Sequence, residues 1–85
     1  MPSTTVAVGS SIGLHARPAA VIAEAVAAAG VPVTLAVADS EPVDAGSALL
    51  IMTLGATKGT DVTVTSDDAD AVEKVAQLVA ADLDA

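Results

Sequence analysis

One short segment of the chain combines residue types that suit phosphoryl chemistry. His15, the only histidine, stands two residues before Arg17, and Pro18 follows directly. Proline is accepted inside a helix only in its first turn, so a helix must begin close to His15. The free backbone N–H groups of that turn form an anion site beside the imidazole. Because neutral imidazole is a nucleophile and a guanidinium suits phosphate, the segment is a candidate acceptor of a phosphoryl group.

Other roles for this histidine follow from the same residues. A structural histidine that caps the helix explains the position of His15 equally well. A metal site is not expected, because one histidine without cysteine or a nearby carboxylate is not a ligand set. A serine hydrolase is not expected either, because Ser10 and Ser11 lack a nucleophile elbow and an orienting acid. No complete P-loop is present, so no nucleotide cofactor is expected. A non-catalytic module that binds a phosphate or carboxylate ligand at the helix N-terminus stays open.

Length and charge restrict the class of protein. Eighty-five residues predict a single domain over residues 1–85. Eleven acidic residues against three basic ones give a net charge of −8, which argues against nucleic acid and anionic membranes as partners. The longest apolar run, residues 48–52, is too short for membrane insertion. No cysteine and no signal-peptide pattern occur, so we expect a cytoplasmic protein, and a monomer.

The hydrophobic pattern predicts seven elements in the order βαββαβα. Strands are expected at residues 4–8, 33–37, 42–44 and 60–65, and helices at 16–29, 47–52 and after a cap at one of residues 66–68. A turn is expected at 39–41. The core face of the last helix is predicted to hold Val72, Val75, Ala76, Val79 and Leu83. This order favours one sheet with helices packed on one face.

The second predicted helix is too short and too apolar to bury every side. It contains Leu49, Ile51 and Met52 and follows Ser47, a good N-cap. An exposed apolar patch usually marks a contact surface. We expect the exposed side to carry Ala48, Leu49 and Met52, with Ala20 on the first helix.

The sequence GLHARPA at residues 13–19 resembles the active-site signature of the HPr family, the histidine-containing phosphocarriers of the bacterial phosphoenolpyruvate:sugar phosphotransferase system. The resemblance covers the whole chain and implies an α+β open-faced β-sandwich, a four-stranded antiparallel sheet covered by three helices. It implies that His15 accepts phosphate on Nδ1 from enzyme I, which draws it from phosphoenolpyruvate, and donates it to EIIA domains of permeases. Arg17 becomes the charge partner of the phosphate, and the segment around Leu49 docks on enzyme I. Such a carrier is not an enzyme by itself.

Two further points depend on this resemblance. In many relatives a serine at the position of Ser47 is phosphorylated by an ATP-dependent kinase as a regulatory mark, but the residues after Ser47 depart from that regulated type. Ser47 is therefore either a simple helix cap or a regulatory site. A carrier of a nitrogen-regulatory or dihydroxyacetone branch would look the same, and the sequence names neither the sugar nor the permease.

Overall fold

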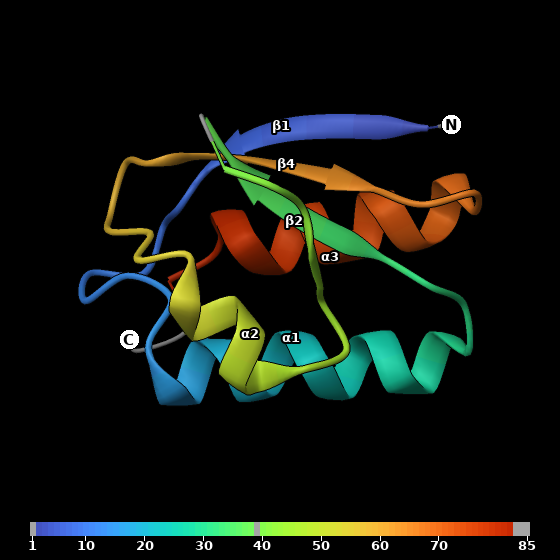
Figure 1. Cartoon of the computed structure of the whole chain (residues 1–85), viewed down its shortest axis with the longest axis horizontal. Helices are drawn as coiled ribbons and strands as arrows, with labels where there is room; N and C mark the ends of the chain where they lie inside the picture. The colour runs from blue at the N-terminus through green and yellow to red at the C-terminus, as the bar shows by residue number, and fades with distance from the viewer. Residues whose placement is uncertain (1, 39, 83–85) are drawn as a thin grey trace.

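A four-stranded antiparallel sheet forms one layer of the molecule, and helices cover one of its faces (Figure 1). The computed structural model describes residues 2–38 and 40–82. Their elements, in chain order, are β1 (Ser3–Ala7), α1 (Ala16–Ala29), β2 (Thr34–Val37), β3 (Val43–Asp44), α2 (Ala48–Thr53), β4 (Asp61–Thr65) and α3 (Ala69–Ala80). The predicted α+β class and the predicted element order are both confirmed.

The strands lie in the order β1-β4-β2-β3, and every neighbouring pair is antiparallel. β4 is therefore central and pairs with β1 on one side and β2 on the other. In the view of Figure 1 the sheet runs along the top, α1 along the bottom, and α3 between them. The short helix α2 lies beside the first half of α1, at the end of the molecule where the loops before α1 and after α2 meet.

The core is aliphatic because the chain has no aromatic residue. Along β4 the side chains alternate, with Val62 and Val64 buried against the helices and Thr63 half-buried on the other face. The open face is lined with β-branched hydroxyl residues, which suit a solvated sheet surface. The hydroxyls of Thr5 and Thr63 are 2.9 Å apart across β1 and β4. This alternation leaves one face of the sheet free and directs all three helices to the other.

Most predicted boundaries agree with the structure within one residue. Val8 lies beyond the end of β1 but stays buried, and its amide donates to the Thr60 carbonyl at 3.0 Å. Ser47 and Asp68 are the N-caps of α2 and α3, as their side chains predict. The predicted α3 face is buried at all four described positions, and Leu83, together with Asp39 of the predicted turn, lies outside the described residues.

The difference between core and surface leucines gives a test of this packing. Leu35 of β2 is fully buried in the core, whereas Leu49 is 69% exposed. Leu35→Ala should lower the free energy of unfolding in urea by about 2 to 5 kcal/mol, because it removes apolar contacts and leaves a cavity. The matched Leu49→Ala change should cost less than about 0.5 kcal/mol. Equal losses would contradict the packing described here.

Candidate functional site

His15 is the N-cap of α1 and is exposed. Its backbone is extended, its carbonyl accepts a hydrogen bond from the Ala19 amide at 2.9 Å, and its imidazole makes no capping bond to the helix. Pro18 has no N–H group, so the amides of Ala16 and Arg17 are the two first-turn donors without a partner in the helix. His15 therefore stands at the positive end of a 14-residue helix, next in the chain to two amide donors that have no hydrogen-bond partner among the described residues.

The loop before α1 is fixed at both ends. At its start the Gly9 amide donates to the Val79 carbonyl, at 3.0 Å, which ties the loop to the end of α3. At its end the Leu14 amide donates to the Ala56 carbonyl, also at 3.0 Å. Gly13 has a φ of 78°, and a Cβ there would collide with the Ala56 carbonyl oxygen. Only glycine suits both the backbone conformation and the close approach that set the position of His15.

The opposite wall of the site comes from the chain that leaves α2. A turn over residues 57–60 closes on itself through the Thr60 amide and the Thr57 carbonyl, and the Gly59 amide donates to Val8 at 2.9 Å. Between this turn and the start of α1 lies a hollow of about 210 Å³. Its lining includes His15, Ile12, Met52 and Thr57. The histidine thus borders an open hollow and is not enclosed in the core.

The local charge at the site is opposite to that of the molecule. Arg17 is exposed in the first turn of α1, and that turn has no acidic residue. In the described part of the chain Arg17 has no ion-pair partner. The guanidinium and the two amides, all within the turn that follows His15, form a small cationic spot on a chain of net charge −8. Such a spot suits an anion with several oxygens, above all phosphate.

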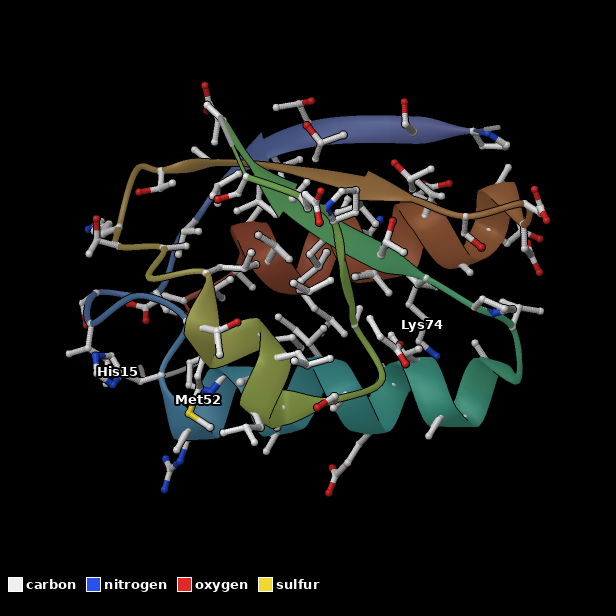
Figure 2. The ribbon with its side chains drawn as sticks, in the orientation of Figure 1. His15, Met52 and Lys74 are labelled. Atoms are coloured by element: carbon white, nitrogen blue, oxygen red, sulfur yellow. The ribbon has the colours of Figure 1, made fainter. Side chains whose placement is uncertain are left out.

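Exposed apolar side chains lie close to His15, since Ile12 and Met52 line the same hollow. Figure 2 shows His15 and Met52 at the same end of the molecule, with Lys74 far from both. Leu49 is 69% exposed, Ile12 55% and Met52 36%, and Leu49 and Met52 are three residues apart on one side of α2. We call Ile12, Leu49 and Met52 the apolar patch. Large apolar side chains exposed together beside a polar centre are typical of a protein contact surface.

Of the sequence-predicted site residues, most lie where they were expected. His15 and Arg17 come together at the start of α1, and Ala20 is exposed on that helix. Ala48 was expected on the exposed side, but this is wrong: it is half-buried against the core, because it shares with Ile51 the side of α2 that packs inward. The Ser47 hydroxyl accepts from the Leu50 amide at 3.3 Å and so caps α2.

Among the residues at the hollow that sequence reasoning missed are Ile12 and Thr57. Ile12 is an apolar residue in a loop otherwise made of serine and glycine, and that contrast was a usable signal. Thr57 carried no such signal, because its place beside His15 depends on the contact between two loops more than 40 residues apart in the chain.

No described helix is long and apolar enough to span a membrane.

Comparison with known proteins agrees with this geometry. The model of the PTS-HPr family, described as the PTS HPr component phosphorylation site, matches residues 2–81. The chain belongs to the HPr family. Over 47 residues, 55% of the chain, it is 53% identical to a phosphocarrier protein HPr of Streptomyces coelicolor, and this match spans 50% of that relative's own length.

The fold is that of HPr proteins of known structure. A crystal structure of HPr from Thermoanaerobacter tengcongensis superposes with a TM-score of 0.83 at 28% identity, covering 93% of this chain and 91% of that one. A phosphocarrier protein HPr from Bacillus anthracis gives a TM-score of 0.82 at 30% identity, covering 92% and 95%. The four-stranded antiparallel sheet with three helices is therefore the HPr fold.

The close approach at Gly13 predicts an unequal response to alanine at two glycines. Gly13 and Gly59 both have positive φ, but only a Cβ at Gly13 meets a neighbouring backbone. Gly59→Ala should cost about 1 to 2 kcal/mol of stability from its backbone conformation. Gly13→Ala should cost at least about 1 kcal/mol more and shift the imidazole signals of His15 in NMR spectra. Equal stability losses, with unchanged His15 signals, would contradict the fixed loop.

Proposed function

We propose that this protein is a phosphocarrier: His15 accepts a phosphoryl group from phosphorylated enzyme I and donates it to EIIA domains of permeases. The observation that carries the proposal is the exposed His15 at the N-terminus of α1, followed by two amides and an Arg17 side chain that have no partner among residues 2–38 and 40–82. Membership of the HPr family supports it.

The arrangement suits a transfer in line. An unprotonated Nδ1 of His15 attacks phosphorus, and the new N–P bond forms as the bond from phosphorus to the donor breaks and its electron pair leaves with the donor. The equatorial oxygens carry the negative charge of the transition state. The amides of Ala16 and Arg17 and the Arg17 guanidinium, all in the helix turn that follows His15, would stabilise that charge. In the donation step, an acceptor group of the next protein would attack the phosphorus from the opposite side, and the N–P bond to His15 would break.

The open, shallow site suits transfer of the phosphoryl group from His15 to a second protein. A carrier must hold phosphate less tightly than an enzyme holds a substrate, and His15 borders an open hollow with Arg17 two residues away in the chain. A partner protein can therefore bring its own acceptor group against the phosphorus. The protein by itself would catalyse no turnover, and pure protein is expected to hydrolyse neither ATP nor phosphoenolpyruvate.

The apolar patch and Ala20 would form the docking surface for enzyme I. Ile12 and Met52 line the same hollow as His15, and Ala20 lies three residues after Arg17 in α1, so a partner seated on them would have its reacting group near His15. Phosphorylation of Ser47 stays a prediction: it would place a phosphate at the start of α2 and remove the hydroxyl that caps Leu50.

The alternatives differ in partner or in chemistry. A carrier of a nitrogen-regulatory or dihydroxyacetone branch would use the same His15 with other partner proteins. An anion-binding module would bind phosphate reversibly and form no covalent bond. The first turn of α1 has no acidic residue, which suits a covalent phosphoryl group and a reversibly bound anion equally. Covalent labelling therefore distinguishes the carrier from the anion-binding module.

Covalent labelling of His15 is the test of the proposal. Incubation with enzyme I and phosphoenolpyruvate should add one acid-labile, base-stable phosphoryl group, measured by mass spectrometry of the intact protein. His15→Ala should abolish the label while leaving the thermal melt unchanged, because the side chain is exposed and caps nothing. A labelled His15→Ala protein would disprove the assignment, and an unlabelled wild type would favour the anion-binding module.

Arg17 should matter for transfer and not for stability. Arg17→Ala removes a charge-assisted phosphate contact, so the rate of phosphoryl transfer from enzyme I should fall on the order of a hundredfold. The melting temperature should stay within a few degrees, because the side chain is exposed and unpaired. Lys74→Ala, which removes the same charge far from His15, is the matched control and should keep the wild-type rate. Equal rates in both variants would show that Arg17 has no special role.

Leu49 provides the test of the docking surface. Leu49→Asp should raise the KM for enzyme I about tenfold or more, because an apolar anchor is replaced by a charge. Its melting temperature should hardly change, since the side chain is 69% exposed. Ile51→Asp, two residues away and fully buried, should instead unfold the domain. If Leu49→Asp is also unfolded, or its KM is normal, the patch is not a docking surface.

A further inference from the structure

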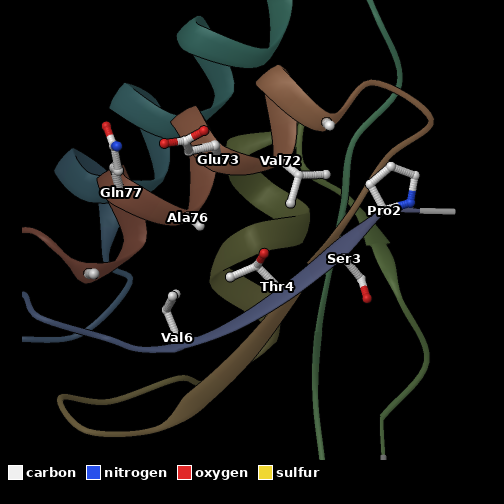
Figure 3. A pocket seen from close by; sticks show the side chains of 10 residues that line it. Pro2, Ser3, Thr4, Val6, Val72, Glu73, Ala76 and Gln77 are labelled. Carbon is white, nitrogen blue, oxygen red and sulfur yellow. The ribbon is translucent and has the colours of Figure 1, made fainter.

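A groove runs between β1 and α3, away from His15. It has a volume of about 490 Å³ and shares no lining residue with the hollow beside His15. Figure 3 shows Thr4 and Val6 of β1 directed toward Val72 and Ala76 of α3, with Glu73 and Gln77 along the upper rim. The floor is apolar, and small side chains leave it open, because this chain has no aromatic residue to fill the edge of its core.

The strand beside this groove has a free edge. β1 is the outermost strand on its side of the sheet. The Val8 amide donates to Thr60, and the Ser66 amide donates to the Pro2 carbonyl, so even-numbered residues of this strand face β4. By the alternation of an antiparallel ladder, the N–H and C=O groups of the odd-numbered residues point outward, and nothing in the described ranges 2–38 and 40–82 pairs with them. These residues are Ser3, Thr5 and Ala7.

We propose that this edge and groove form a docking site for an extended segment of another protein, which adds to the sheet as a fifth strand beside β1. The outward groups of Ser3, Thr5 and Ala7 would form the ladder, as in other cases of strand addition. Every second side chain of the added strand then enters the groove, over Val6, Val72 and Ala76. The side chains between them join the threonine-rich open face of the sheet.

Charge identifies the partner segment as basic. Glu73 is the one charged side chain among the described residues that line the groove, and the chain as a whole carries −8. A lysine or arginine directed into the groove lays its aliphatic stem along the apolar floor and brings its charge to Glu73. A second copy of this chain fits poorly, because β1 has no basic residue and two copies of charge −8 repel.

The expected segment has small apolar residues and one basic residue on its groove side, with threonine-like residues on the other. Edge strands are normally protected by lysine, a bulge or a cover. β1 has none of these within the described residues, and only Pro2 stands at its start. The edge is therefore left available for pairing.

The test uses a capped peptide of about seven residues, Thr-Val-Thr-Lys-Thr-Val-Thr, the length of an ordinary strand. Titrated into the full-length protein and followed by NMR, it should shift the amides of Ser3, Thr5 and Ala7 and slow their hydrogen exchange at least about tenfold. Glu73→Gln should weaken binding about two- to fivefold, as expected for a rim charge pair. Glu24→Gln, which removes the same charge from α1, and His15→Ala should bind the peptide like the wild type.

Three control measurements complete the test. A peptide N-methylated at every residue, which lacks the ladder donors in either strand direction, should not bind, and a peptide with glutamate in place of lysine should bind more weakly. Equal binding of either control peptide would overturn the proposal, as would unchanged amides of Ser3, Thr5 and Ala7 at millimolar peptide. Sedimentation without peptide should show no association through this edge. Protection of these amides in a concentration-dependent dimer would assign the edge to a second copy instead.

Discussion

The hydrogen bond from the Leu14 amide to the Ala56 carbonyl joins two loops on which the candidate site depends. One loop leads into α1 and the other leaves α2, so this contact brings His15 together with Met52 and Thr57. It requires a close backbone approach, which glycine at position 13 permits. Without it α1 would still form and pack on α2, but the loop that leads to His15 would lose the anchor at its end.

The local parts of this arrangement could be predicted from the sequence because they depend on neighbouring residues. Pro18 predicted the start of α1, and the capping residues Ser47 and Asp68 predicted the starts of α2 and α3. The four-stranded sheet and the resemblance around His15 were also recognisable. Two features could not be predicted, because they depend on contacts between distant segments. One is the side of α2 that packs inward and half-buries Ala48, and the other is the set of loop residues that meet at the hollow.

Exposure is the property that connects the site with the proposed phosphocarrier. An active site that holds its substrate is usually buried, whereas His15 and Arg17 are both exposed and the patch around them is apolar. The acidic remainder of the molecule makes the cationic spot at the start of α1 distinct to a partner. The groove between β1 and α3 lies apart from this centre, so a segment bound there would leave His15 free for transfer.

The central claim is that the N-terminus of α1 stabilises a phosphoryl group on His15 through the amides of Ala16 and Arg17. The most direct measurement compares ¹⁵N–¹H NMR spectra before and after phosphorylation by enzyme I and phosphoenolpyruvate. The account predicts that the amide protons of Ala16 and Arg17 show the largest downfield shifts, as hydrogen-bond donors to phosphate do. Phosphorylation of His15 without movement of these two signals, or phosphate on another residue, would contradict it.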